Sequence, residues 1–320
     1  LDVAEFIGKP PLADDARRFG QACERFLGDV AVPKTEERLH VTPETVENVT
    51  AKYLLAVQEA GRLYRHIRDR KPENGFVTEI SFDEADSPQS PIELLLILVA
   101  IAEEGIPADT IAPRFSGRFL AGVDYIGNVS QFTHEFELDL AVTAYAVQEL
   151  RLPEGLKLSV HFGGDKFSLY GPMRRALRKF DAGIHLKTAG TTWLEELIGL
   201  AEAGGDGLAL AKEVYRTARS RLAEMCEPYA AVVDIDVERL PTPERVDCMS
   251  GTEFAATLCH DPTDARYNPH FRQLLHVGYK VAAEMGDRFL DVLRSHSDVV
   301  GPDVTENLFM GHIRPLFLDE

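Results

Sequence analysis

The sequence predicts an α/β protein, and we expect a (β/α)8 TIM-like barrel followed by C-terminal helices. Short runs of β-branched and aromatic residues alternate with longer amphipathic runs, which is typical of a parallel sheet covered by helices. A barrel needs eight strands, and six are predicted. The chain begins with Leu1 inside the first of them, so we expect part of the barrel to precede residue 1.

An open doubly wound sheet is the alternative architecture. No glycine-rich dinucleotide motif follows any predicted strand, which argues against a nucleotide-binding version of that fold.

Strands are expected where β-branched and aromatic residues cluster in short runs. The six runs are residues 1–6, 76–82, 110–115, 156–162, 183–187 and 230–236. Pro113 has to lie at the end of its strand, because proline has no N–H for the ladder.

Helices are expected where apolar residues recur every three or four positions. Before residue 250 these segments are residues 11–27, 45–70, 91–104, 131–150, 172–180, 191–203 and 208–226. Thr42 or Thr45 is the N-cap of the second segment, and Gly105 ends the third.

The remainder of the chain is predicted to be helical, over residues 253–259, 269–294 and 304–315. We therefore expect a barrel domain over residues 1–250. A helical extension over residues 251–320 is expected to pack on it.

The composition excludes several classes of partner. The formal net charge is -18 and the pI is about 5.0, so the surface repels nucleic acid. The longest apolar run, residues 92–102, is shorter than the roughly 20 residues that span a bilayer. The four cysteines form no CxxC pair, which favours a reducing cytoplasm. The sequence gives no prediction of oligomeric state.

Two histidines lie near the ends of consecutive predicted strands, His161 and His185. Consecutive barrel strands are neighbours, so the two imidazoles could bind one metal ion. Each could equally be an ordinary polar residue at a strand end, and two histidines are not a motif. The strand over residues 76–82 adds carboxylates: Glu79 and Asp83 share one face, and Glu84 enters the following loop. One of them could be a general acid or base, or all three could form a solvated acidic loop.

Lysines follow the same strands, Lys166 after one and Lys187 at the end of the next. Either could bind substrate, form a Schiff base or donate a proton, although exposed lysines are common after strands. Arg114 and Asp124 follow the strand at residues 110–115. Arg272 and His276 share one face of a helix that begins at Asn268 and Pro269. That face could hold an anion, or it could belong to a helix packed outside the barrel.

Five segments closely resemble the tagaturonate/fructuronate epimerase family. They are residues 78–84 (TEISFDE), 160–167 (VHFGGDKF), 179–204 (KFDAGIHLKTAGTTWLEELIGLAEAG), 267–279 (YNPHFRQLLHVGY) and 304–309 (VTENLF). The motifs are long and are not shared with generic barrels, and the likeness extends along the whole chain.

The resemblance implies a metal-dependent isomerase of hexuronate catabolism that interconverts D-tagaturonate and D-fructuronate. The metal would be a divalent cation such as Zn, Mn, Ni or Co, with His161 and His185 as ligands. Glu84 or Glu79 would be the acid or base. The side chains that would hold the substrate are Lys187, Lys166, Arg114, Asp124, Arg272 and His276. The resemblance also implies an Asp-His pair upstream of Leu1.

The two sugars differ at a carbinol carbon β to the ketone, so simple enolisation does not acidify its C–H bond. Retro-aldol cleavage with re-addition, metal-assisted proton transfer and transient oxidation remain open, and the last lacks a visible nicotinamide motif. A class II aldolase, an epimerase of the neutral sugars fructose and tagatose, and a sugar-acid binding protein are the competing functions.

Overall fold

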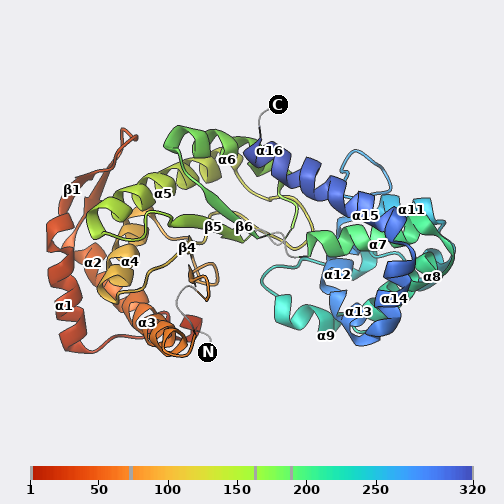
Figure 1. Ribbon diagram of the computed structural model, residues 1–320, viewed down its shortest axis with the longest axis horizontal. Helices are drawn as coiled ribbons and strands as arrows, with labels where there is room; N and C mark the ends of the chain where they lie inside the picture. The colour runs from red at the N-terminus through yellow and green to blue at the C-terminus, as the bar shows by residue number, and fades with distance from the viewer. Residues whose placement is uncertain (1–2, 72–74, 162–163, 188–189, 319–320) are drawn as a thin grey trace. The chain divides into compact units, whose positions relative to one another are not determined.

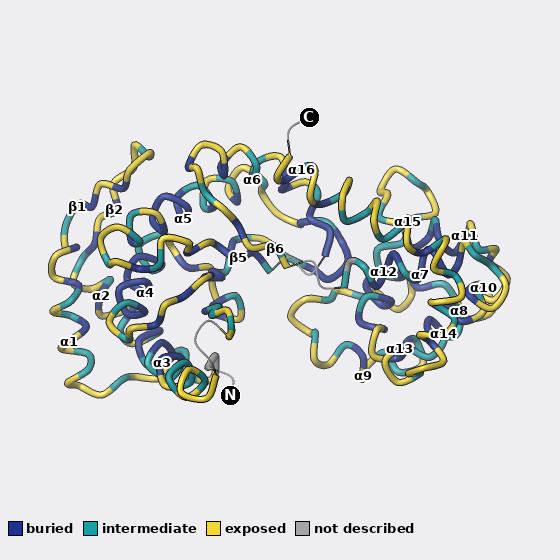
Figure 2. The backbone as a smooth tube through the Cα atoms, viewed as in Figure 1, coloured by how far each residue is buried: buried dark blue, intermediate teal, exposed yellow. Residues whose placement is uncertain are grey.

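The computed structural model describes residues 3–71, 75–161, 164–187 and 190–318. The chain forms two compact units, drawn as ribbons in Figure 1, and Figure 2 shows which residues are buried. Unit 1 consists of Leu1–Ser116, Asn128–His161 and Arg175–Leu186, and unit 2 consists of Gly117–Gly127, Phe162–Arg174 and Lys187–Glu320. The boundary expected at residue 250 stays a prediction.

Unit 1 contains a sheet with the strand order β3-β4-β5-β6 (Figure 1). Its strands are β3 (Glu79–Ser81), β4 (Thr110–Ala112), β5 (Lys157–His161) and β6 (Ile184–Lys187). The β3–β4 and β4–β5 pairs are parallel, and Ile111 is the register partner of both Ile80 and Leu158. Consecutive strands are neighbours, so their C-terminal ends meet at one edge. The α/β class with a parallel sheet is confirmed, and closure into a barrel stays a prediction.

Helix α4 (Pro91–Glu103) forms the centre of the unit 1 core. It begins with a capping box, in which the Glu93 N–H donates to Ser90 Oγ and the Ser90 N–H donates to the Glu93 carboxylate. Residues 94–101 are all buried, as a helix that is apolar on every side requires. Helix α5 (Val129–Leu150) packs against it.

The other elements of unit 1 lie mainly before the sheet. They are η1 (Val3–Phe6), α1 (Ala13–Cys23), η2 (Glu24–Phe26), β1 (Gly28–Ala31), β2 (Arg38–Val41), α2 (Pro43–Val49), η3 (Thr50–Leu54) and α3 (Leu55–Arg68). Strands β1 and β2 form an antiparallel hairpin that the sequence pattern did not reveal. Helix α6 (Phe167–Phe180) has residues in both units.

Unit 2 is built from helices and short turns. They are α7 (Thr191–Ala203), α8 (Gly205–Ser220), α9 (Leu222–Cys226), η4 (Glu227–Tyr229), η5 (Val237–Arg239), α10 (Pro243–Asp247), α11 (Gly251–Leu258), α12 (Pro269–Val277), α13 (Tyr279–Met285), α14 (Asp287–Ser295), α15 (Ser297–Glu306), η6 (Asn307–Ile313) and α16 (Arg314–Phe317). Phe271 of α12 lies at the centre of the core, with ring centroids 4.6 Å from Tyr215 and 5.1 Å from Phe254. Aromatic packing therefore joins α8, α11 and α12.

Two predicted strands are wrong. The run at residues 1–6 contains the 3-10 turn η1, which contacts α3, while residues 1–2 lie outside the described part. The run at residues 230–236 is irregular. Its backbone forms hydrogen bonds with a loop and with a side chain. Val232 O accepts from the Ala121 N–H, and the Asp234 N–H donates to the Gln273 side chain at 2.8 Å. Local β-propensity is thus overridden by tertiary partners.

Most helices occur where the periodicity predicts them, and α7 has the predicted bounds. Thr42 caps α2 by accepting from the Thr45 N–H. The helix predicted over residues 269–294 is broken at Gly278 and at Gly286, whose φ is +56°. Residue 162, the end of one predicted strand, lies outside the described residues. No helix in the described part is both long and apolar enough to cross a membrane.

Candidate functional site

Two histidines and two carboxylates converge on the unit 1 sheet, where His161 is the last residue of β5, Glu79 the first of β3 and His185 the second of β6. Glu79 of β3 lies between the imidazoles, with Oε1 3.1 Å from His161 Nε2 and Oε2 3.0 Å from His185 Nδ1. Asp83, in the loop after β3, accepts from His161 Nδ1 at 2.6 Å. The expectation that His161 and His185 lie close together, with Glu79 and Asp83 on one face, matches this geometry.

Hydroxyl groups of the same sheet hold this cluster in place. Thr110 Oγ1 of β4 donates to Glu79 Oε2 at 2.9 Å, and Ser159 Oγ of β5 lies 3.1 Å from His185 Nδ1. The Asp83 carboxylate also accepts from Ser81 Oγ. The His161 side chain is 16% exposed and that of His185 is 45% exposed. The His185 imidazole is therefore the more exposed of the two.

The donor chemistry of this cluster fits a divalent metal ion. Imidazole nitrogen and carboxylate oxygen lie about 2.0–2.2 Å from zinc, so two donors on one tetrahedral ion are roughly 3.3 Å apart. The Glu79 oxygens lie within a few tenths of an ångström of that separation from His161 and His185. Asp83 would orient His161 through Nδ1 and leave Nε2 for the metal. Within the described residues, no group of three or more His, Cys, Asp or Glu side chains is already arranged to hold a metal ion.

Arg114, Glu84 and Lys187 lie near strand ends but differ in surroundings. Arg114 Nη1 donates to Asp83 O at 3.3 Å and to Ala85 O at 2.6 Å, which fixes the loop after β3. Glu84 lies in that loop and is exposed. Lys187 is the last residue of β6 and is also exposed. Their roles with substrate stay predictions.

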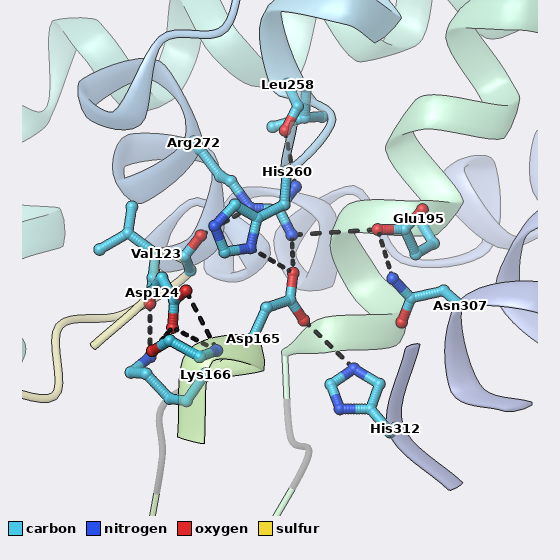
Figure 3. Close-up of polar contacts among 12 residues, drawn as sticks. Val123, Asp124, Asp165, Lys166, Glu195, Leu258, His260, Arg272, Asn307 and His312 are labelled. Atoms are coloured by element: carbon cyan, nitrogen blue, oxygen red, sulfur yellow. Dashed lines mark hydrogen bonds and ion pairs between the residues drawn. The ribbon is translucent and has the colours of Figure 1, made fainter. Parts of the chain in front are cut away.

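Unit 2 contains a second polar cluster, centred on the fully buried Asp165 (Figure 3). Arg272 Nη2 donates to Asp165 Oδ2 at 2.5 Å, and His260 Nδ1 lies 3.2 Å from the same oxygen. His312 Nε2 lies 3.2 Å from Oδ1, and His312 Nδ1 contacts Tyr170 Oη at 2.6 Å. One carboxylate, just before α6, thus links α12, η6 and the segment after α11.

Two buried cations of this cluster anchor the loop over residues 117–127. Lys166 Nζ donates to Leu120 O at 2.9 Å and to Val123 O at 2.6 Å, and Arg272 Nε donates to Gly122 O at 2.6 Å. Both cations are completely buried. Asp124, in the same loop, accepts from the Ser168 hydroxyl at 2.9 Å. Lys166 and Arg272 therefore shape this loop.

Burial and neighbouring charges shift several pKa values in unit 2. Burial would raise the pKa of Asp165, but the charge of Arg272 and hydrogen bonds from His260 and His312 hold it well below its usual range. Burial lowers the pKa of Lys166 to about 7, against the opposing charges of Asp165 and Asp124.

Two further buried groups in unit 2 are expected to be uncharged over part of the physiological range. Burial raises the pKa of Glu195 to about 7, although the charge of Arg272 opposes the shift. Burial lowers the pKa of His276 to about 4, and the charges of Arg272 and Lys166 add to the effect.

The sequence did not reveal every participant. The role of Asp83 as partner of His161, and the buried cluster of Asp165 with His260 and His312, depend on contacts between distant segments. Asp165 and Lys166 are adjacent after a strand, and that pattern does not distinguish buried from exposed charges. His312 lies in a helical run with no strand nearby.

Known proteins resemble this chain over most of its length. A family model described as "UxaE: tagaturonate epimerase" matches residues 13–308. A curated tagaturonate/fructuronate epimerase from Thermotoga maritima is 26% identical over 275 residues, covering 85% of this chain and 51% of the relative. This chain thus spans about half the length of that relative.

Solved structures of a fructuronate-tagaturonate epimerase from Cohnella laeviribosi have a similar fold. A glycerol-complexed crystal structure matches with a TM-score of 0.76 and 22% identity, covering 99% of this chain and 63% of that one. The native crystal structure matches with a TM-score of 0.72 and 23% identity, with the same coverage. With the family model covering residues 13–308, the chain belongs to the tagaturonate epimerase family.

Proposed function

We propose that this chain carries the catalytic centre of an epimerase that interconverts D-tagaturonate and D-fructuronate. The observation that carries the proposal is the Glu79 carboxylate between His161 and His185. Working residues in parallel α/β folds gather at the C-terminal ends of the strands, where His161 ends β5 and Asp83 follows β3. Membership of the tagaturonate epimerase family supplies the substrate class.

We further propose that the four-stranded sheet belongs to a (β/α)8 barrel. The support is the order β3-β4-β5-β6, with helices α4, α5 and α6 between consecutive strands. The four cysteines are free, in keeping with the proposed cytoplasmic location.

Glu79, His161 and His185 are the residues that would hold a divalent metal ion, and zinc, manganese, nickel or cobalt all accept such donors. When bound, the ion would act as a Lewis acid on the ketone oxygen of the sugar. Asp83 would fix the orientation and tautomer of His161.

The proposed reaction inverts the carbinol carbon β to the ketone by retro-aldol cleavage. A carboxylate, for which Glu84 is the candidate, removes the proton of the hydroxyl on that carbon. The bond to the α carbon breaks, and its electron pair moves to the α carbon. The resulting aldehyde turns over, the α carbon attacks its other face, and the proton returns to the oxygen. Metal-assisted proton transfer is the alternative route to the same product.

Lys187 is the proposed contact for the sugar carboxylate or hydroxyls, because it lies exposed at the end of β6. Three buried or half-buried cations would affect substrate binding indirectly, because each fixes a loop by donating to its backbone carbonyl groups. They are Arg114, Lys166 and Arg272. Asp124 remains a candidate contact in unit 2.

Product analysis tests this proposal. The chain is incubated with D-tagaturonate and a divalent metal ion, and the products are separated by chromatography. D-fructuronate alone is expected. Accumulating three-carbon fragments would favour a class II aldolase, and conversion of fructose or tagatose alone would favour the neutral-sugar epimerase. Binding of the sugar acid without turnover would leave a sugar-acid binding protein.

A further inference from the structure

A cavity of about 660 Å³ lies in unit 2, whereas Glu79, His161 and His185 belong to unit 1. It is bordered by helices α7, α12, α13 and α14, which Figure 1 labels. Its lining includes Trp193, His276, Ala283 and Phe289. Cavities of about 300–1,000 Å³ are the usual size for small-molecule sites.

The described residues of the lining are almost entirely apolar, and none of them is charged. Trp193 has its indole N–H occupied, because Nε1 donates to Leu275 O at 2.7 Å. Tyr229 and Tyr279 also line the cavity, and their hydroxyl groups lie 3.4 Å from each other. The cavity therefore offers ring faces and methyl groups, and few hydrogen bonds.

His276 is the exception in this lining. Its Nε2 is buried and has no hydrogen-bond partner among the described residues. Leaving such a group unpaired costs about 1–3 kcal/mol. The low pKa of His276, caused mainly by burial, keeps the imidazole neutral near pH 7. A neutral imidazole nitrogen pairs with a hydroxyl in either tautomer, because a hydroxyl both donates and accepts.

Three glycines make room for this imidazole. Gly190 has a φ of +87°, and a Cβ there would lie 2.4 Å from His276 Nε2. Gly122 and Gly164 also have positive φ, and a Cβ on them would lie 3.4 Å and 3.9 Å from atoms of His276. Residues without side chains thus surround the ring on the side away from its helix, so a side chain at Gly190 would displace it.

We propose that this cavity binds an uncharged, mostly apolar small molecule that carries one hydroxyl group, of the phenol class. Its ring would lie among Trp193 and Phe289, and its hydroxyl would pair with His276 Nε2. Since Gly190 shields Nε2 from water, the imidazole has to turn as the ligand enters. An anionic ligand is disfavoured, because burying a carboxylate without a cation costs several kcal/mol. The proposal is independent of the epimerase function.

The fluorescence of Trp193 reports binding directly, because it is the only tryptophan of the chain. The chain is titrated with phenol, with excitation at the red edge of tryptophan absorption. Toluene, a similar ring without the hydroxyl, and benzoate, an anion, are titrated in parallel. A saturable change with phenol is expected. Phenol should bind roughly fivefold more tightly than toluene, since one hydrogen bond is worth about 1 kcal/mol, and more tightly than benzoate. No saturable change, or tighter binding of benzoate, would overturn the proposal.

Variants locate the site. Ala283→Phe fills the cavity and should abolish the phenol response, whereas Ala223→Phe, at another exposed helical alanine of unit 2 outside the lining, should retain it. His276→Phe should remove the preference for phenol over toluene. Circular dichroism checks that each variant is folded. If the phenylalanine side chain prevents folding, Ala283→Leu is used in place of Ala283→Phe. A full response in both Ala283 variants, or an unchanged preference in His276→Phe, would contradict the assignment.

D-tagaturonate distinguishes this site from a sugar-acid site that includes His276. It should not displace phenol, because the cavity lacks a cation for its carboxylate. Displacement would overturn the assignment to an uncharged ligand, whatever the outcome of the epimerase assay.

Discussion

Individual residues divide into those whose partners the sequence reveals and those whose partners it does not. Glu79 begins β3 whereas His161 ends β5, so the contact of Glu79 with both imidazoles is a finding of the structure. His161 and His185 lie on consecutive strands, which are neighbours in the sheet, so their proximity was predictable. The burial of Lys166 and Arg272 was not. Their sequence neighbours resemble those of exposed cations, and only the loop over residues 117–127 supplies the carbonyls that they bind.

Asp83→Asn tests the proposed orientation of His161. The amide retains the size of the side chain but loses the negative charge that faces His161 Nδ1. Affinity for a divalent metal ion should fall by about 10–100-fold, as is typical when the orienting partner of a ligand is lost. Isothermal titration calorimetry measures the change. Asp86→Asn, at an exposed residue of the same loop, should bind like the wild type, and equal affinities for all three proteins would refute the orienting role.

Glu195 should make the stability of the protein depend on pH. Its pKa is raised from 4.5 to about 7 in the folded chain, mainly by burial. The stability it contributes is therefore fully present below pH 4.5 and is lost as the pH rises through 7. Relative to Glu195→Gln, the wild type should lose on the order of 2–3 kcal/mol of unfolding free energy across this interval.

Urea unfolding at several pH values measures this difference. Glu227→Gln, at an exposed glutamate of unit 2, is the control and should keep the pH profile of the wild type. Parallel pH profiles for the wild type and Glu195→Gln would show that Glu195 is not the group responsible.

At the scale of elements, apolar periodicity predicted helices better than β-branched runs predicted strands. Helix α7 and the capped start of α4 follow from local sequence. The run at residues 230–236 has the composition of a strand, but in the described part of the chain a loop and Gln273 bind its backbone in place of a strand. The breaks at Gly278 and Gly286 show that a continuous apolar stripe does not ensure one continuous helix.

Close packing of helix backbones in unit 2 gives a test at this scale. A Cβ on Gly251, the first residue of α11, would lie 2.1 Å from Ala201 O of α7. Gly251→Ala should therefore destabilise the protein by roughly 1–3 kcal/mol. Gly20→Ala, within α1, is the matched control, because a Cβ there meets nothing within 4 Å, and it should be neutral or stabilising by up to about 1 kcal/mol. Thermal unfolding measures both, and equal melting temperatures would refute the close approach of α7 and α11.

At the scale of the whole molecule, the sequence indicated the α/β class and the family, and both are confirmed. The division into two units could not be predicted, because each unit collects segments that are far apart in the chain. Glycines lie at three of the crossings, Gly117, Gly127 and Gly163-Gly164, but the other two fall inside α6 and at the end of β6, where the sequence pattern marks no boundary.

The rate of conversion of D-tagaturonate to D-fructuronate, measured after chelation and after return of one divalent metal ion, tests the proposed catalytic centre most directly. The chelated chain should be inactive and the reloaded chain active. Glu79→Gln should remain at least about 100-fold slower than the reloaded wild type, whereas Glu44→Gln, at an exposed glutamate of unit 1, should match it. Full activity in strong chelator, or a wild-type rate in Glu79→Gln, would contradict a metal-dependent centre built on Glu79, His161 and His185.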